Sequence, residues 1–455
     1  MTTAIAGASG FVGRALTVRL LEDNHDVLAL HRSVKTPVAS ERTVVVDLSD
    51  EVATARALAN VDAAYYLVHS MAAGEVFQDL DLRLATTFGR AASQAGVSRI
   101  IYVGALGDAP SSAHLSSRQE VGTALRRSGV DVVELRAAVV FGAGSISFEM
   151  LRYLTERLPA MVCPRWVRTR IQPIALVDLL DYLEQSLLVV PGVYEVGGAD
   201  VTTYREMISA YARARGLHAR VIFDIPWLTP RLSSYWVDLV TPVDRSVSHS
   251  LIESLVTEVV VLNDAPTQHA FSVVPMGVER ALVTALDDQE NDVAQTLFAR
   301  RPGQRDGVYT VVASLEIPSG LDVAIRRDLK AIGGTLSWYG AETGWALRLV
   351  LGRFLGEKLR PRRPEALVPG ALVDWWRVAL IEETQLVLRS DGWFPGDAWL
   401  GYRVLEGSLQ QVAAFRPRGI PGFIYWTMLG PLHRIVFDRM IRHRVRRVSE
   451  ASTSR

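Results

Sequence analysis

The first 145 residues alternate short apolar runs with stretches of helical periodicity. Phe11–Leu21 repeats its apolar residues with the period of a helix. The apolar runs have the length and composition of buried strands: Thr3–Ala6, Asp26–Leu30, Thr43–Val46, Ala63–Val68, Arg99–Val103 and Val130–Leu135. Strands that alternate with helices predict a parallel sheet with helices on both faces. The predicted fold class of this part is α/β, a doubly wound sheet.

A different pattern begins at about residue 307. A strand at Val308–Leu315 precedes two helical stretches, Leu321–Ile332 and Trp345–Leu355, and Pro431–Val448 predicts a long last helix. Between them, four segments alternate like antiparallel strands: Val373–Ile381, Gln385–Arg389, Trp399–Leu405 and Leu409–Phe415. This order predicts an α+β domain in which a curved antiparallel sheet grips a helix.

These patterns divide the chain into four parts. Residues 1–260 form the first domain, in which residues 146–255, with helices, short strands and more proline, form a substrate subdomain. Residues 261–306 are predicted to be a connecting segment and linker, because they contain the polar run 287–292 and end in Arg301-Pro302-Gly303. Residues 307–448 form the second domain and residues 449–455 a tail.

Composition narrows the function classes. The 455 residues carry 49 basic and 49 acidic side chains, so a nucleic-acid partner is not predicted. The one cysteine, Cys163, cannot form an internal disulfide or a thiolate metal cage, and no histidine pair has zinc-site spacing, so no metal site is predicted. With no basic signal-peptide region and no run of 18 apolar residues, we predict a cytoplasmic protein.

The strongest motif is a glycine turn directly after the first strand. It reads Gly7, Ala8, Ser9, Gly10, Phe11, Val12, Gly13 and opens the first helix. Glycines allow a tight turn and close approach of the backbone to a pyrophosphate, and the N–H groups of the helix N-terminus attract phosphate. Nucleotide binding by these residues is the favoured interpretation, and glycines retained only for packing are the alternative.

The residue after the second strand indicates which cofactor binds. That strand ends in His31-Arg32, and an arginine there favours a 2′-phosphate through a forked, charge-assisted contact. NADP(H) is therefore the predicted cofactor and NAD(H) the alternative, because Arg32 also fits a solvated surface position. Asp47 and Leu48, after the third strand, are placed to contact the adenine, although Asp47 also fits a helix cap.

The spacing of these glycines, with Asp47-Leu48, resembles that of the extended and atypical short-chain dehydrogenase/reductases. Leu135–Gly142 and Gln172–Asp178 resemble later segments of that superfamily, and the closest likeness is to its NmrA-like branch, which includes the Rossmann-fold accessory subunit of respiratory complex I. The resemblance covers about residues 1–260. It implies a Rossmann-type sheet that binds NAD(P), with Gln172 and Asp178 near the substrate pocket.

Two stretches resemble a bacterial subgroup of NAD(P)-dependent oxidoreductases: Tyr66–Met71 and Pro230–Trp236. In that subgroup a domain of unknown function follows the Rossmann domain, and residues 307–448 resemble it in Phe394–Leu400 and Phe415–Gly419. Its implied fold is helix-grip, START-like.

The catalytic dyad that the superfamily implies, Tyr-x-x-x-Lys, is absent. His114 stands where the tyrosine is expected and Arg118 where the lysine is expected, and only Lys35, Lys330 and Lys358 occur in the whole chain. His114 is the candidate acid, because histidine transfers protons near neutral pH, and Arg118 is the candidate partner; a surface histidine is the alternative. His69 and Ser70, at the end of the fourth strand, are candidate cofactor contacts or crevice packing.

Other groups are open to two interpretations. Arg231 and Tyr235 either line a substrate pocket or form surface contacts. Five tryptophans either line an apolar ligand cavity or form the core of the second domain: Trp375, Trp376, Trp393, Trp399 and Trp426. The last helix carries six arginines against Asp438 and is either a solvated helix end or a peripheral contact with the inner face of a membrane.

Three functions follow. The first is an NADP(H)-dependent oxidoreductase acting on a small apolar carbonyl or quinone-like ligand, based on the glycine turn. The second is an NAD(P)(H)-binding redox sensor or assembly factor without turnover, based on the missing dyad. The third places the function in the C-terminal domain, as a binder of an apolar ligand or lipid.

Overall fold

The computed structural model describes residues 1–33, 42–69, 77–107, 113–225, 255–300, 307–318, 320–335, 337–340, 346, 350, 363–391 and 395–453. The chain divides into two compact units, Met1–Asp288 and Gln289–Arg455.

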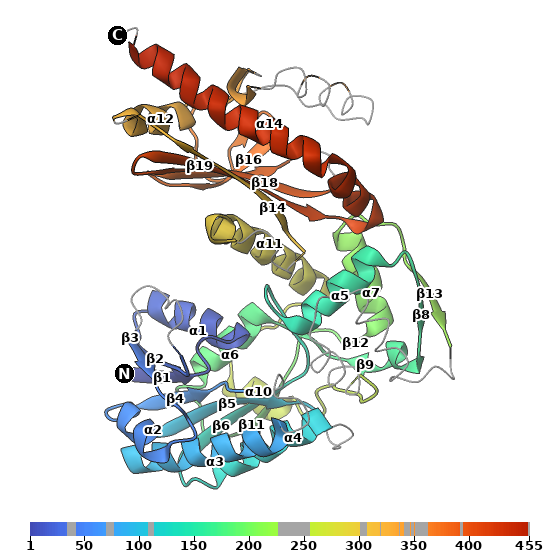
Figure 1. Ribbon diagram of the computed structural model, residues 1–455. Coiled ribbons are helices and arrows are strands. Elements are labelled where there is room, and N and C mark those ends of the chain that lie inside the picture. Colours follow the sequence, from blue (N-terminus) through green and yellow to red (C-terminus); the bar gives the residue numbers. More distant parts are fainter. Residues whose placement is uncertain are drawn as a thin grey trace. The chain divides into compact units, whose positions relative to one another are not determined.

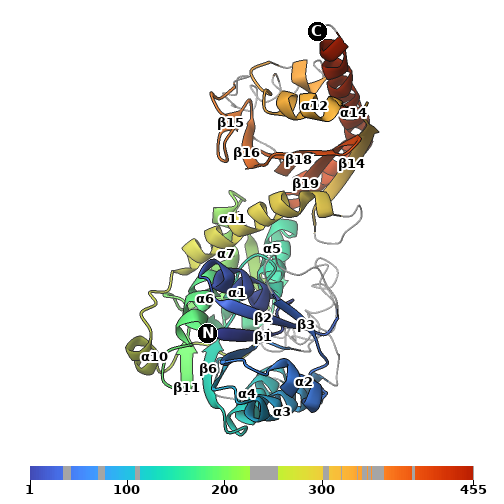
Figure 2. The ribbon, with the colours of Figure 1, turned by 90° about the vertical axis from the view of Figure 1, so that its left-hand side faces the viewer.

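The first unit is built on a seven-stranded parallel sheet (Figures 1 and 2). In spatial order its strands are β11 (Gly192–Val196), β6 (Asp131–Ala137), β5 (Arg99–Ala105), β4 (Ala63–Tyr66), β1 (Thr2–Ala6), β2 (Asp26–His31) and β3 (Arg42–Val45). Strand order reverses beside β1, so a crevice opens there at the carboxyl ends of the strands, where such sheets bind ligands.

Helices cover both faces of this sheet, which explains the continuous apolar runs of its strands. One face packs against α1 (Phe11–Glu22) and α6 (Leu176–Gln185). The other packs against α2 (Glu51–Ala57), α3 (Phe77–Ala95) and α4 (Ala113–Arg126) (Figure 2). The predicted doubly wound sheet is confirmed.

A smaller layer follows the sheet and has its own apolar core. Its helices are α5 (Ile146–Arg157), η2 (Arg165–Arg168), α7 (Tyr204–Ala214) and α11 (Val278–Thr296). Helix α10 (Ala265–Ala270) packs instead beside β11 of the main sheet. Its short strands are β7 (Val140–Phe141), β8 (Ala160–Cys163), β9 (Arg170–Ile171), β10 (Ile174–Ala175), β12 (Thr202–Thr203) and β13 (Val221–Asp224).

The second unit is a six-stranded antiparallel sheet with helices on both faces. In spatial order the strands are β14 (Tyr309–Glu316), β19 (Ser408–Pro417), β18 (Gly396–Leu405), β17 (Gln385–Ser390), β16 (Trp376–Ile381) and β15 (Leu372–Val373). Successive side chains along a strand point to opposite faces of this sheet and so enter two different cores. On one face Val387 and Trp399 pack against the last turns of α11 and against η3 (Leu297–Ala299). On the other face Leu388 and Leu400 belong to the second core. That face is covered by α12 (Leu321–Leu329), η4 (Ser337–Tyr339) and α14 (Gly419–Thr453).

Two segments differ from the sequence-based expectation. Residues 261–306, predicted as a linker, contain α10 and α11, and the second unit begins at Gln289 within α11 rather than at residue 307. The last helix begins at Gly419 rather than Pro431. Pro421 lies in the first turn, where a missing N–H costs nothing, and Pro431 is tolerated inside a helix that packs on the sheet.

Candidate functional site: an apolar cavity beside the glycine turn

The glycine turn is fixed by close backbone contacts. Gly7 has φ +90, a conformation that glycine adopts without strain, and its carbonyl accepts a hydrogen bond from the Gly10 N–H at 2.9 Å. A Cβ atom on Gly7 would lie 2.7 Å from the Leu67 carbonyl oxygen, and one on Gly13 would collide with the Gly7 carbonyl. Because α1 begins at Phe11, its first N–H groups point out at the carboxyl end of β1, as a pyrophosphate requires.

A cavity of about 560 Å³ adjoins this turn. Its walls come from the turn itself, the ends of β4, β5 and β6, the β6–β7 connection, α5 and α7. Most of the described lining is aliphatic or aromatic: Phe11, Val12, Leu67, Val103, Leu106, Leu115, Val139, Val140, Phe141, Ile146, Met150, Leu151, Leu154, Trp166, Met207, Ile208, Leu255 and Val259. Among the described lining residues, only His69, Arg118 and Tyr204 are ionisable.

Arg118 lies in the cavity wall where the resemblance places a lysine. One of its guanidinium nitrogens, Nη2, donates a hydrogen bond to the Val103 carbonyl of β5. The guanidinium also lies 5.2 Å from the centre of the Tyr102 ring, and the Tyr102 hydroxyl donates to the Arg118 carbonyl at 2.9 Å. Arg118 is therefore held against the sheet, from where it presents a fixed positive charge to the cavity.

His69 follows β4 and is paired with a buried acid on α3. Its Nδ1 atom lies 2.8 Å from Oδ2 of Asp81, whose side chain is 3% exposed. Burial lowers the pKa of His69 and the Arg118 charge lowers it further, whereas the hydrogen bond with Asp81 raises it. The carboxylate favours the tautomer with a proton on Nδ1, so Nε2 is the nitrogen left with a lone pair.

Arg32 and Asp47 lie close enough to interact at the ends of β2 and β3. The Ser49 N–H and hydroxyl both donate to Asp47, which lowers the pKa of this carboxyl, and the charge of Arg32 lowers it further. Arg32 is exposed, so its guanidinium is available to a phosphate. Leu48 is partly buried against the core beneath α2 and α3.

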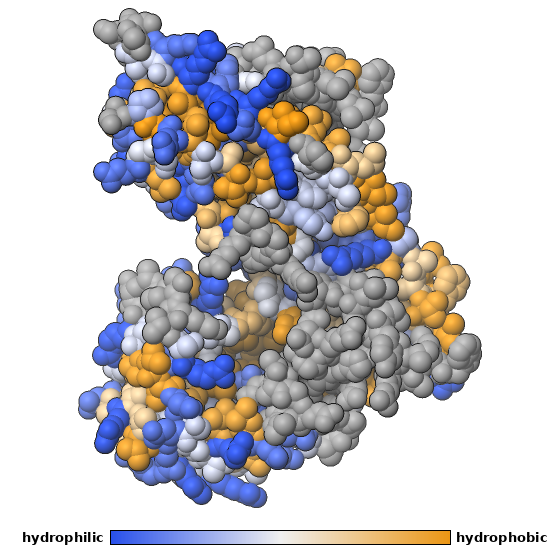
Figure 3. All heavy atoms as spheres, viewed as in Figure 1, coloured by the Kyte–Doolittle hydropathy of each residue, from blue (hydrophilic) through white to orange (hydrophobic). Residues whose placement is uncertain are grey.

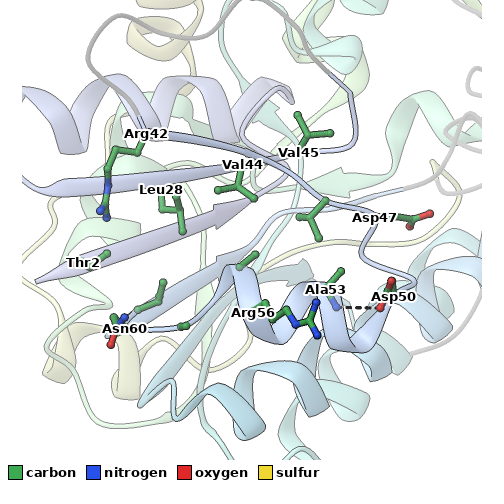
Figure 4. Close-up of a pocket in the computed structure, with 14 residues that line it drawn as sticks. Thr2, Leu28, Arg42, Val44, Val45, Asp47, Asp50, Ala53, Arg56 and Asn60 are labelled. Atoms are coloured by element: carbon green, nitrogen blue, oxygen red, sulfur yellow. Dashed lines mark hydrogen bonds between the residues drawn. The ribbon is translucent and has the colours of Figure 1, made fainter.

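A second hollow, of about 640 Å³, lies between the edge strand β3 and α2 (Figure 4). Arg42 and Arg56 carry its positive charges, and Asp47 and Asp50 its negative charges. Oδ1 of Asp50 accepts a hydrogen bond from the Ala53 N–H at 3.0 Å and so caps α2. The glycine turn is not among the described residues that line this hollow, so we place the candidate site in the apolar cavity.

Gln172 and Asp178, predicted near the substrate pocket, hold backbone segments together. The Gln172 amide donates to the Gly198 carbonyl at 2.7 Å and accepts from the Val261 N–H at 2.9 Å. Asp178 accepts from the Met276 N–H at 2.8 Å, and burial raises the pKa of its carboxyl although this hydrogen bond lowers it. Neither residue is among the described lining of the cavity.

Four other predicted positions lie outside what the structure describes. These are Ser70, Arg231, Tyr235 and the side chain of His114, whose backbone lies in the first turn of α4. Their roles stay predictions. Conversely, no sequence motif pointed to Asp81, which lies twelve positions after His69 inside a helix. Among the described residues no group of three or more potential ligands could hold a metal ion.

Comparisons with known proteins agree with this geometry. Residues 7–139 match a family described as NAD(P)H-binding, and residues 304–440 match a family described as protein of unknown function (DUF2867). A dTDP-6-deoxy-L-talose 4-dehydrogenase (NAD(P)(+)) of Kitasatospora kifunensis is 25% identical over 257 residues, which cover 48% of this chain and 80% of that enzyme. An uncharacterized protein of Mycobacterium tuberculosis is 25% identical over 170 residues, 37% of this chain and only 18% of that protein.

Solved structures show the same fold. A nucleoside-diphosphate-sugar epimerase from Staphylococcus aureus superposes with a TM-score of 0.50 at 16% identity, covering 62% of this chain and all of that one. The first unit is therefore a Rossmann-type domain whose residues 7–139 match an NAD(P)H-binding family. The second unit, with its antiparallel sheet, matches the DUF2867 family over residues 304–440.

Proposed function

We propose that this chain is an NADP(H)-dependent oxidoreductase that reduces an apolar carbonyl or quinone-like substrate in the cavity beside the glycine turn. The observation that carries this proposal is the chemistry of the cavity lining. Among the described lining residues there is no acid or amide, and the one arginine already donates to a backbone carbonyl. An apolar ring gains from burial there, because it leaves water without losing hydrogen bonds.

A sugar nucleotide fits this lining poorly. Its hydroxyl groups and diphosphate would lose their hydrogen bonds with water, and the described wall offers few replacements. The dehydrogenase of Kitasatospora is named for a sugar nucleotide, so the two proteins would share a fold and cofactor class but differ in substrate.

The chain's own residues divide the chemistry between them. The turn Gly7, Ser9, Gly10, Phe11, Val12 and Gly13 would hold the pyrophosphate, and Arg32 with Asp47 the adenosine end. A nicotinamide cofactor supplies the hydride when bound. We assign proton transfer to His69, which lines the cavity: Nε2 takes up a proton from water, Asp81 orients the imidazolium and stabilises its charge, and Nε2 then donates that proton to the reduced substrate. His114, the candidate acid of the sequence, stays an alternative donor.

A second candidate is nucleotide binding without turnover. This candidate is supported by Arg118, which stands at the position where the resemblance implies a lysine. That lysine would lower the pKa of the catalytic tyrosine and hold the ribose, whereas Arg118 donates its hydrogen bond to the Val103 carbonyl. The third candidate, apolar-ligand binding by a helix-grip domain, has weaker support. Trp375, Trp376 and Trp399 are buried in the cores of the second unit, which favours a packing role for them.

Oxidation of NADPH by the full chain tests these candidates. We expect turnover with a naphthoquinone, little with simple alcohols and ketones, and none with dTDP- or UDP-hexoses. His69→Gln should lower kcat about 10²–10⁴-fold with cofactor affinity unchanged, whereas His114→Ala should not. Efficient oxidation of a sugar nucleotide would contradict the proposal. Bound NADPH without turnover on any acceptor would favour the second candidate.

A further inference from the structure

The first half of α14 exposes large apolar side chains along one face. Their exposed fractions run from 48% to 74%, and most are three or four positions apart, so they share one side of the helix. The members of this apolar face are Ile420, Phe423, Ile424, Met428, Leu432 and Ile435. In Figure 3 hydrophobic atoms gather over the part of the helix that follows β19.

The apolar side chains in the second half of α14 are buried, unlike those of the apolar face. Met440, Ile441 and Val445, in the second half of α14, are buried in the core of the second unit. An exposed apolar row of this size on a folded unit marks an interaction site more often than a solvated surface.

The exposed surface of α14 becomes basic from the end of the apolar face onward. Arg434, Arg439, Arg442 and Arg446 are exposed there. Arg442 and Arg446 bond Asp438 and Glu450 four positions away, whereas Arg434 and Arg439 form no ion pair with any other described residue. Asp438 and Glu450 are the only acidic residues among the 35 residues of α14. The helix therefore presents apolar and positive groups in sequence along one line.

We infer that this line of α14 lies on an anionic lipid surface, with the apolar face in the interfacial layer and the arginines against lipid phosphates. Burial of the apolar side chains and attraction of arginine to anionic headgroups act together in such helices. Among the described residues no helix is long and apolar enough to cross a membrane, so we propose contact at the surface. A second copy of the chain is a less suitable occupant, because its own basic half would repel this one in parallel packing.

Co-sedimentation of the full chain with vesicles tests this inference without any assay of turnover. We expect binding to vesicles of phosphatidylcholine and phosphatidylglycerol, weaker binding to phosphatidylcholine alone, and loss of binding as salt is raised. Phe423→Ser with Met428→Ser, and separately Arg434→Gln with Arg439→Gln, should each lower the partition coefficient about tenfold or more.

A matched control is Leu188→Ser, which removes another exposed apolar side chain, 87% exposed, from the first unit. It should bind vesicles as the unchanged protein does. Thermal melting identifies variants that fail to fold, and the exposed positions should leave the melt unchanged. No binding of the folded protein to anionic vesicles would overturn the inference, as would binding that both double variants leave intact. Dimers that dissociate in Phe423→Ser with Met428→Ser, without vesicle binding, would assign the face to a second copy.

Discussion

At the scale of single residues, close backbone contact decides what the glycine turn tolerates. Gly13 lies against the Gly7 carbonyl, and Gly7 against the Leu67 carbonyl, so three segments meet with no room for a methyl group. The requirement is steric at Gly13 and both steric and conformational at Gly7, which has a positive φ. Because these backbone segments lie so close together, the first N–H groups of α1 lie at the crevice.

We expect Gly13→Ala to weaken both folding and cofactor binding. The new Cβ must displace backbone, which costs about 1–3 kcal/mol in a packed site. Urea unfolding and titration calorimetry with NADPH measure the two effects. Gly192→Ala is the control, because Gly192 begins β11 without a positive φ and its added Cβ would meet the Tyr194 ring at an ordinary 3.6 Å, so the substitution should be close to neutral. Unchanged NADPH affinity in Gly13→Ala would contradict the phosphate-binding role of the turn.

Arg32 should set the preference between the two cofactors. Its side chain is exposed next to Asp47, and a hydrogen bond from arginine to phosphate contributes about 1.5–3 kcal/mol. Arg32→Ala should therefore lower the affinity for NADPH about tenfold or more and leave that for NADH nearly unchanged. Equal affinities for both cofactors before and after the substitution would show that Arg32 is only a solvated surface residue.

At the scale of elements, α14 combines three environments. Its first half presents the apolar face to solvent, its second half packs in the core, and His433 lies between them among aromatic rings. The ring centres of Trp426 and Phe437 lie 5.1 and 5.8 Å from that of His433. Burial lowers the pKa of His433 to about 4, so the folded state favours the neutral imidazole.

This gives a prediction for stability against pH. The unfolded chain takes up a proton at His433 near pH 6.5, and the folded one near pH 4. The unfolded state therefore binds more protons between these values, so stability is full above about pH 6.5 and falls as pH is lowered toward about 4. We expect a loss of about 1–3 kcal/mol from this group.

His433→Phe keeps the ring contacts and removes the titrating group. Its free energy of unfolding, measured with urea at several pH values, should fall less steeply than that of the unchanged protein. Identical slopes would show that His433 titrates alike in both states.

At the scale of the whole molecule, the end of α11 belongs to the second unit. Val293, Ala294 and Leu297 pack with Val387 and Trp399 of the sheet. Glu290 pairs with Arg389 and with the buried Arg416, which also bonds Asp397 at 2.9 Å. Residues 289–300 therefore complete both an apolar core and a buried ion cluster.

A fragment of residues 289–455 should fold better than one of residues 307–455. The shorter fragment loses Glu290 from the ion cluster, in which Asp397 still pairs with Arg416, and it loses Val293, Ala294 and Leu297 from the apolar core. Each buried valine or leucine that is lost costs about 1.5–3 kcal/mol. Tryptophan fluorescence during urea unfolding compares them directly. We expect a cooperative transition at a distinctly higher midpoint for the longer fragment. Equal midpoints would place the domain boundary at residue 307, as the sequence pattern predicted.

The sequence by itself determined the two sheets and the glycine turn. Buried parallel strands appear as continuous apolar runs, and the glycine spacing reports a backbone that must pass close to others. It also predicted that the usual lysine is missing, because only three lysines exist. These features are local, so neighbouring residues along the chain are enough to reveal them.

Tertiary structure alone decided what surrounds the site. The cavity takes its apolar wall from strand ends, α5 and α7, which no local pattern connects. The packing of α3 beside the end of β4 also placed Asp81 within hydrogen-bond distance of His69. Likewise, the fold places Gln172 and Asp178 where they form hydrogen bonds with backbone groups distant in sequence. The linker predicted from polar residues became α11, because Glu290 and its neighbours meet arginines distant in sequence. A polar side chain does not reveal in sequence whether water or a distant opposite charge is its partner, and only the fold specifies which.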